Sequence, residues 1–208
     1  TLDTPKWARP LLAHARYKGV WGGRKSGKSH FMAGMVVVAM CADPNLFVAC
    51  VRQVQKSLKY SPKKLNEEKI EAFGVGHLFE VQQNVIKRIG GKGECIFCGL
   101  SDHTADSIKS MDGFHIWWIE EAQSITEHSM QLLIPTVRGN KGPFGAKQPE
   151  VWFSWNPRRR ADPVEKLLRP RGKARESAIV VRANYTDNPF LAQHELDEIE
   201  FDRASNPD

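Results

Sequence analysis

Short apolar runs alternate with longer segments of helical character along this chain. Residues 46–51 (LFVACV), 115–119 (HIWWI) and 151–155 (VWFSW) are continuous apolar runs, which are typical of strands buried on both faces of a parallel sheet. Residues 28–42 are apolar over the length of a helix, and a turn signal at 43–45 (Asp-Pro-Asn) ends it. This alternation predicts an α/β sandwich with a mainly parallel sheet.

The same criteria place the remaining elements. We expect a short helix over 11–18, a strand at 18–21, a polar helix over about 57–73, a hairpin of 84–91 and 93–100, a strand at 178–185 and a terminal helix over 191–204. The hairpin turn is predicted at 90–93, where three of the four residues are glycine. No internal repeat interrupts this organisation.

The segment between the first strand and the first long helix has the spacing of a phosphate-binding P-loop. Its residues are Gly22, Gly23, Arg24, Lys25, Ser26, Gly27, Lys28 and Ser29, which fit G-x-x-x-x-G-K-[ST] at every fixed position. Glycines let successive N–H groups point at phosphate oxygens, and the helix N-terminus favours negative charge. Lys28 is expected to reach the β/γ-phosphates and Ser29 to ligate Mg²⁺. The alternative is a chance Gly/Ser/Lys-rich turn.

Two adjacent carboxylates, Glu120 and Glu121, follow the apolar strand at 115–119. Adjacent residues at a strand end can diverge, so that Glu120 would hold Mg²⁺ and Glu121 would orient and deprotonate the attacking water. The metal-side residue of P-loop ATPases is usually Asp, and Glu is one methylene longer. The alternative is a solvated acidic helix start.

The strand at 151–155 ends in Ser154-Trp155-Asn156-Pro157. If this strand neighbours the one that carries Glu120, Ser154 and Asn156 lie beside the γ-phosphate and could sense whether it is present. Asn-Pro is also a common turn, so a structural role stays open.

Composition adds a basic cluster. The net charge is +6, and the segment 158–175 holds eight basic residues against two acidic ones. Such a cluster suits a polyanion, with Arg158, Arg159 and Arg160 as candidate DNA contacts, while a solvated basic loop is the alternative. No apolar run approaches the roughly 20 residues of a membrane span.

The four cysteines include one C-x-x-C pair, Cys95 and Cys98. A zinc site needs a second such pair or nearby histidines, and Cys41 and Cys50 have the wrong spacing to supply it. Buried reduced thiols are expected, with metal or redox use as the alternative.

These three motifs, in this order, resemble the ATPase domain of the large terminase subunit of tailed double-stranded DNA bacteriophages. The flanks match too: Arg16-Tyr17 before the P-loop, IKSMDG (108–113), IPTVRG (134–139) and NYTDNPFL (184–191). The resemblance covers nearly the whole chain, from about Ala13 to Asp208.

The resemblance implies a three-layer fold of the P-loop NTPase type (ASCE/RecA-like), with an ATPase core over 1–175 and a small lid or linker subdomain over 176–208. The family's C-terminal nuclease domain is expected to be absent from this chain. The implied cofactors are ATP and Mg²⁺. The implied partners are double-stranded DNA, the portal protein, the small terminase subunit and other copies in a ring on the procapsid, in the cytoplasm of the bacterial host.

The resemblance also implies residue roles. Arg24 matches an arginine that contacts phosphate during catalysis, Glu121 the catalytic carboxylate and Glu120 the metal-side acid. Arg16 and Tyr17 match the adenine-side segment, and Ser154, Asn156 and Pro157 the coupling motif.

Ring ATPases often complete the site with a basic residue from a neighbouring subunit. Lys109 and Arg138 are the candidates, because both lie in motif flanks, and a structural ion pair is the alternative for each. Other function classes stay open as well: a helicase-like P-loop ATPase acting on other nucleic acid, and a nucleotide-dependent switch without turnover.

Overall fold

One twisted sheet of eight strands organises the chain in a computed structural model that describes residues 4–53, 62–100 and 111–205. The strands are β1 (Tyr17–Trp21), β2 (Phe47–Arg52), β3 (Phe79–Val81), β4 (Val85–Arg88), β5 (Glu94–Gly99), β6 (Ile116–Glu120), β7 (Glu150–Trp155) and β8 (Ala178–Arg182). Their order is β3-β4-β5-β2-β6-β7-β1-β8. All neighbours from β5 to β8 are parallel, and only the β3-β4-β5 edge is antiparallel. The predicted α/β fold with a mainly parallel sheet is confirmed.

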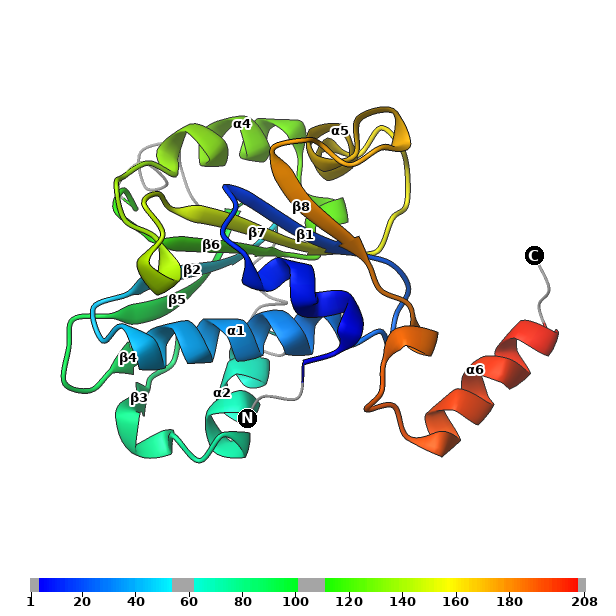
Figure 1. Cartoon of the computed structure of the whole chain (residues 1–208), viewed down its shortest axis with the longest axis horizontal. Coiled ribbons are helices and arrows are strands. Elements are labelled where there is room, and N and C mark those ends of the chain that lie inside the picture. The colour runs from blue at the N-terminus through cyan, green and yellow to red at the C-terminus, as the bar shows by residue number, and fades with distance from the viewer. Residues whose placement is uncertain (1–3, 54–61, 101–110, 206–208) are drawn as a thin grey trace.

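Helices cover both faces of the sheet and make three layers (Figure 1). They are α1 (Lys28–Ala42), α2 (Pro62–Ala72), α4 (Glu127–Thr136), α5 (Pro163–Leu168) and α6 (Gln193–Ser205), with a 3-10 helix η1 at Lys6–Leu12. α1 and α2 lie on one face and α4 and α5 on the other, while α6 projects away from the body. Among the described residues, no helix has the length and apolar character needed to cross a membrane.

Two apolar clusters, one on each face of the sheet, form the core. The cluster under α1 includes Val36 and Trp118, and the cluster under α4 includes Leu133 and Trp117. Trp117 and Trp118 are neighbours on β6, so their side chains point to opposite faces and each anchors one layer. The continuous apolar runs of the sequence therefore reflect burial on both faces.

Strand register decides where polar side chains meet. Trp21 of β1 is level with Trp155 of β7 and Arg182 of β8, and Glu120 of β6 is level with Ser154. Because the strands are parallel, their carboxyl ends share one edge, and the loops that follow β1, β6 and β7 meet there. β7 lies between β1 and β6. The strand that ends in Ser154 therefore neighbours the strand that carries Glu120, which is the condition that the sequence analysis sets for the role of Ser154 and Asn156.

Some elements differ from the sequence expectations. The predicted helix over 11–18 is wrong: the helical turn is η1, it ends at Leu12, and residues 13–16 lead directly into β1. Side-chain bonds explain the difference, since His14 bonds Glu150 and Arg16 donates to the carbonyl of Pro149, which fixes this segment to the sheet edge. β3, α4 and α5 were not predicted.

The C-terminal part begins inside the sheet. β8 falls within the region 176–208 that the sequence analysis assigns to a lid, and it pairs with β1 along its whole length. The chain leaves the sheet after β8, passes beside the P-loop and ends in α6.

Candidate nucleotide-binding and hydrolysis site

The P-loop connects the carboxyl end of β1 to the first turn of α1. Lys25 has a left-handed backbone (φ 58°), as does Gly27 (φ 78°), the residue before α1. Such turns aim successive N–H groups into one concave anion site. A Cβ on Gly22 would lie 2.0 Å from the carbonyl oxygen of Ala183, and its φ is 143°, so only glycine fits this position.

The Lys28 side chain is buried within the loop. Its Nζ donates to the carbonyl oxygen of Gly22 (3.2 Å) and to Ser26 Oγ (2.8 Å), and also bonds the Gly23 carbonyl. Burial lowers the pKa of Lys28 to about 8, against a smaller opposing effect of Glu120. An ammonium desolvated in this way gains more from a phosphate than a solvated one would.

The Ser29 hydroxyl donates to Glu120 Oε1 at 3.0 Å, which joins the P-loop to β6. The other Glu120 oxygen pairs with the Arg52 guanidinium at the end of β2. Glu120 is only 4% exposed, and burial raises its pKa, while the hydrogen bond and charge of Arg52 oppose that shift. Arg52 is therefore the group that opposes protonation of this buried carboxylate next to the phosphate site.

The next residue, Glu121, points elsewhere because its backbone is left-handed (φ 52°). Its side chain is 49% exposed and lies 3.6 Å from Arg52. Although it precedes the 3-10 turn at 122–124, its side chain caps nothing there, which argues against a mere helix start. The adjacent carboxylates thus diverge, as the sequence suggested: one is buried against Ser29 and the other faces the cavity.

The end of β7 contributes two polar groups. Ser154 Oγ accepts a hydrogen bond from Trp118 Nε1 (3.0 Å), which ties β7 to β6. The backbone N–H of Asn156 donates to Gln123 Oε1 at 3.1 Å. Asn156 Oδ1 is buried and has no hydrogen-bond partner within the described part of the chain. A buried acceptor without a partner is costly, so this oxygen is suited to a water or ligand.

All these groups line one cavity of about 320 Å³. Its lining includes Arg24, Lys25, Ser26, Gly27, Lys28, Ser29, Arg52, Glu120, Glu121, Gln123, Ser154 and Asn156. The structure thus brings together most of the predicted P-loop, carboxylate and coupling residues. Arg24 is exposed at the cavity wall.

The donor set also suits Mg²⁺, a cation that takes a few protein oxygens and keeps several waters. The hydroxyl of Ser29 and the carboxylate of Glu120 lie in hydrogen-bond contact beside the P-loop. The second Glu120 oxygen is neutralised by Arg52, which leaves one carboxylate oxygen and one hydroxyl for the ion or its waters.

The segment after β8 packs against the P-loop. Asn184 Oδ1 accepts from the N–H of Gly23 (3.4 Å), and Asn188 Nδ2 donates to the carbonyl of Lys25 (2.8 Å). The Lys25 side chain reaches α6, where it lies 3.1 Å from Glu198. The C-terminal part therefore holds the backbone that forms the anion site.

Arg16 and Tyr17 are not brought to this site, so their assignment to the adenine side is corrected. They lie at the start of β1, at the sheet edge opposite the P-loop. Arg16 is engaged there with the carbonyls of Pro149 and Val137. A five-residue strand spans about 16 Å, which separates this segment from the cavity.

Of the two candidate trans-acting residues, Arg138 lies in the described part of the chain. Arg138 is exposed and forms an ion pair with Asp112, with Nε 3.0 Å from the carboxylate. This pair lowers the pKa of Asp112 through the hydrogen bond. An ion pair of this kind is the structural role that the sequence analysis names as the alternative for Arg138. Lys109 lies outside the described residues.

The predicted basic segment follows the coupling motif directly. Arg158, Arg159 and Arg160 are exposed and line a second cavity of about 590 Å³, together with Pro157 and Arg169. The Arg169 guanidinium stacks on Trp21 of β1 at 3.6 Å from the ring centroid. The basic surface thus adjoins the strand that leads into the P-loop.

All four cysteines are free thiols, and the C-x-x-C pair Cys95 and Cys98 forms no disulfide. Cys95 meets Cys50 across neighbouring strands, with the sulfurs 3.5 Å apart. Burial raises the pKa of Cys98 to about 12, so its thiol stays protonated. Within the described ranges, no group of three His, Cys, Asp or Glu side chains is placed to hold a metal.

Sequence reasoning missed four residues of this site: Arg52, Gln123, Asn184 and Asn188. Arg52 had a usable signal, a basic residue directly after a buried apolar strand. Asn184 and Asn188 lie in the NYTDNPFL motif, which was noted but not connected to the P-loop. Gln123 has no recognisable signal, because its role depends on a contact with the next strand.

Comparisons with known proteins agree with this geometry. A family model described as phage terminase large subunit matches residues 14–208. A comparison with curated proteins finds no match. Among solved structures, the large terminase of a thermophilic bacteriophage is similar with a TM-score of 0.69 and 14% identity, covering 94% of this chain and 47% of that one. Two other structures of that protein contain ADP and ATP-γ-S.

Two further structures are similar over nearly their whole length. The large terminase ATPase domain of Thermus phage P74-26 has a TM-score of 0.64 at 13% identity, covering all of this chain and 90% of that one. The N-terminal domain of the DNA packaging ATPase of bacteriophage phi29 has a TM-score of 0.65 at 14% identity, with 88% and 97% covered. The chain spans about half the length of the full-length terminase it resembles. With a family match over 195 of its residues and the P-loop sheet described above, the chain belongs to the phage terminase large subunit family.

Proposed function

We propose that this chain is the ATP-hydrolysing motor domain of a phage terminase large subunit, which powers the movement of double-stranded viral DNA into the procapsid. One observation carries the enzymatic part of the proposal: an exposed carboxylate, Glu121, shares one cavity with the P-loop and with a buried carboxylate bonded to Ser29. Nucleotides in the structures of a similar terminase support ATP as the ligand.

In the proposed reaction, a water attacks the γ-phosphoryl group in line with the departing ADP. Lys28 and the N–H groups of the P-loop neutralise the charge of the phosphates, and Arg24 contacts them from the cavity wall. Glu121 orients the water and takes its proton. Bound Mg²⁺, held by Ser29 and Glu120, would neutralise the β- and γ-phosphate oxygens.

The direct test is Mg²⁺-dependent release of phosphate from ATP by the purified chain, measured with and without double-stranded DNA. We expect hydrolysis that depends on Mg²⁺ and that rises when DNA is added. A rate equal to the background in every condition would contradict the proposal and favour a nucleotide-dependent switch.

Coupling of hydrolysis to DNA is proposed to run through the end of β7. Asn156 lines the phosphate cavity, and Pro157 leads directly into three exposed arginines. Loss of the γ-phosphate would change the contacts of Asn156, and this change would be passed to Arg158–Arg160 through the one intervening residue, Pro157. Ser154 fixes the strand end by its bond to Trp118.

Neutralising the three arginines tests the DNA contact. We expect the Arg158→Ala/Arg159→Ala/Arg160→Ala variant to bind DNA less tightly, and the slope of log K against log salt to fall by about 1 for each lost phosphate contact. Binding would be measured by fluorescence anisotropy over a salt series. The matched control is Lys87→Ala/Lys92→Ala/Lys141→Ala, which removes three exposed charges elsewhere. Equal effects of both triple variants would show that only net charge matters.

The assembly is also a proposal. We place this domain in a ring of copies on the portal, together with the small terminase subunit, in the cytoplasm of the bacterial host. Lys109 or Arg138 would complete the site of a neighbouring copy. The segment after β8, which contacts the P-loop through Asn184 and Asn188, would act as the lid that responds to nucleotide.

A further inference from the structure

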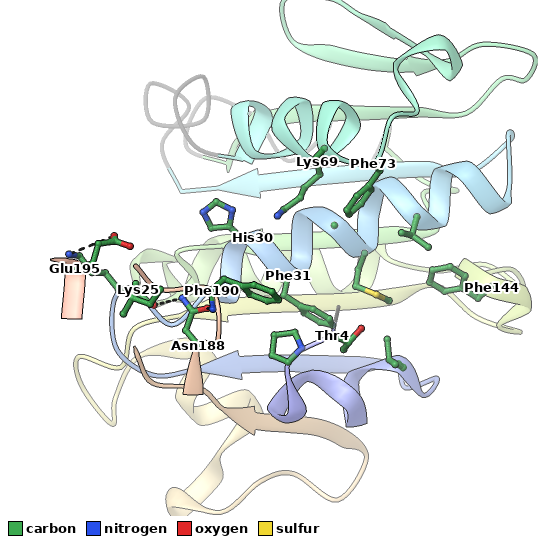
Figure 2. Close-up of a pocket in the computed structure, with 18 residues that line it drawn as sticks. Thr4, Lys25, His30, Phe31, Lys69, Phe73, Phe144, Asn188, Phe190 and Glu195 are labelled. Carbon is green, nitrogen blue, oxygen red and sulfur yellow. Dashed lines mark hydrogen bonds and ion pairs between the residues drawn. The ribbon is translucent and has the colours of Figure 1, made fainter. Parts of the chain in front are cut away.

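A basic cavity lies behind the end of β7 and takes no part in the proposed hydrolysis. It has a volume of about 590 Å³ and is lined by the loop after β7, by α5 and by the turn that follows α5. Its cationic lining residues are Arg158, Arg159, Arg160, Lys166, Arg169 and Arg171, against one acidic residue, Glu165, among those that the structure describes. The larger cavity of about 890 Å³ along α1, on the other face of the sheet, is lined mainly by apolar side chains such as Phe31 and Phe73 (Figure 2). The basic lining is therefore a local feature, and it favours an anionic ligand.

Arg169 is held in a fixed position at the wall of this cavity. Its Nη1 donates to both carboxylate oxygens of Glu165 at 3.1 Å. Glu165 is only 7% exposed and also accepts a hydrogen bond from Trp155 Nε1 (2.9 Å), which anchors the carboxylate to β7. The guanidinium stacks on Trp21, 3.6 Å from the ring centroid. A cation that is already held at one edge and one face loses little freedom when it binds a ligand.

The other edge of the Arg169 guanidinium is open to an anion. Neither Nε nor Nη2 forms a hydrogen bond within the described part of the chain, and the side chain is 18% exposed. These two nitrogens present parallel N–H groups, and a fork of this kind matches two oxygens of one phosphate group. The geometry therefore selects a phosphate group over a simple halide ion.

A short connection joins this cavity to the P-loop. Trp21, on which Arg169 stacks, is the last residue of β1 and directly precedes Gly22. α5 lies close against β1, because a Cβ on Gly19 would be 2.9 Å from Leu168 Cδ1. A shift of the Arg169 guanidinium therefore acts on the first residue of the P-loop through one aromatic ring.

We propose that the basic cavity binds a backbone phosphate of DNA on Arg169, and that Trp21 passes the occupancy of the cavity to the P-loop. This inference rests on the proposed function, since it takes DNA as the ligand. It adds to the exposed arginines of the loop a defined phosphate site and a connection to the nucleotide. The phosphate binds the same guanidinium that Glu165 and Trp21 share, so its arrival changes the contacts of both. Such coupling is reciprocal, and the nucleotide changes the affinity for DNA by the factor by which DNA changes the affinity for nucleotide.

Arg169→Lys tests the phosphate site, because it keeps the positive charge beside Glu165 and removes the planar fork. Binding of a short labelled DNA duplex would be measured by fluorescence anisotropy over a salt series. We expect the variant to bind DNA about 10-fold less tightly, the cost of one hydrogen bond to a charged group. The slope of log K against log salt should stay unchanged, because the number of cations is the same.

Arg175→Lys is the matched control. Arg175 also lies over an aromatic ring of β1, 5.0 Å from the centroid of Tyr17, and is outside the lining of the cavity. Its affinity for DNA should be that of the wild type. Equal losses in the two variants, or no loss in Arg169→Lys, would overturn the phosphate site. If Arg169→Lys does not fold, Lys166→Gln/Arg171→Gln decides: it removes two exposed charges of the same cavity, and the site is wrong if affinity and salt slope both stay unchanged.

The connection to the P-loop is tested by measuring DNA binding with and without saturating ATP-γ-S in Mg²⁺. For the wild-type chain we expect the two dissociation constants to differ by about 5-fold or more. Trp21→Leu keeps every charge of the cavity and should bring the ratio close to one, whereas Trp21→Phe keeps an aromatic surface and should preserve it. A ratio of one in the wild type, or a ratio that Trp21→Leu leaves unchanged, would contradict the connection.

Inorganic phosphate separates DNA from a free anion as the ligand. Its binding to the wild-type chain and to Arg169→Lys would be measured by calorimetry. If Arg169→Lys weakens phosphate binding and leaves DNA binding unchanged, the cavity holds a free anion and the inference is overturned while the proposed function stands. If the wild-type chain binds no DNA at low salt, the DNA part of the proposed function fails and the inference fails with it.

Discussion

Glu121→Gln is expected to lower the rate of ATP hydrolysis by about 10²- to 10⁴-fold while ATP still binds. The substitution keeps the size of the side chain and removes its ability to accept a proton, which is the contribution expected of a general base. Glu121 is exposed to the phosphate cavity and bonds neither Lys28 nor Ser29, so its loss leaves the P-loop contacts in place. Phosphate release and ATP binding would be measured on the same preparation.

Glu71→Gln is the control for this variant, because Glu71 is an exposed glutamate on α2 away from the cavity. It should hydrolyse ATP at the wild-type rate. An unchanged rate in Glu121→Gln would remove the general-base role, and a loss of ATP binding equal to the loss of rate would make Glu121 a binding residue.

Arg52→Met should be the most destabilising change in the site. It leaves the Glu120 carboxylate, only 4% exposed, without its cationic partner. Breaking a buried ion pair in this way costs about 3–5 kcal/mol of folding free energy. Urea denaturation of the variant and of wild type would measure the loss. The double variant Arg52→Met/Glu120→Gln should recover most of it, because no uncompensated charge then remains buried.

The pH dependence of this variant has a definite sign. Burial raises the pKa of Glu120 above its ordinary value of about 4.5, and Arg52 opposes the shift, so removing Arg52 should raise that pKa further. Between the two pKa values the folded state binds the proton and the unfolded state does not. Stability therefore falls as pH rises through this window. We expect the loss caused by Arg52→Met to be smaller at pH 5 than at pH 8, and a loss independent of pH would contradict the buried-carboxylate explanation.

The elements that the sequence identified well are those whose signal is local. The strands around 46–51, 115–119 and 151–155 are buried on both faces. Each is therefore a continuous apolar run that can be recognised without knowing which strands pair with it. α4 was not predicted because its apolar and polar residues do not form a clear helical pattern. Its N-terminus does carry a cap, since the Thr126 side chain accepts a hydrogen bond from the Ser129 N–H. α5 is only six residues long, too short for a helical period to show.

The candidate site divides in the same way. The P-loop can be recognised from the spacing of residues 22–29, because its glycines and Lys28 lie within eight consecutive residues. Arg52 became part of the site only through its contact with Glu120, 68 residues further along. Asn188 likewise contacts the P-loop from 163 residues away, and nothing in its own neighbourhood of sequence indicates that contact.

The sequence by itself determined the fold class, the phosphate-binding loop and the pair of carboxylates, because each depends on residues close together in the chain. The tertiary structure alone decided that Arg16 and Tyr17 lie at the sheet edge opposite the P-loop, that Arg52 pairs with Glu120, and that Asn188 contacts the P-loop. The physical reason is strand order and register: parallel pairing brings the carboxyl ends of β1, β2, β6 and β7 to one edge, and this pairing is made between segments that no local pattern connects.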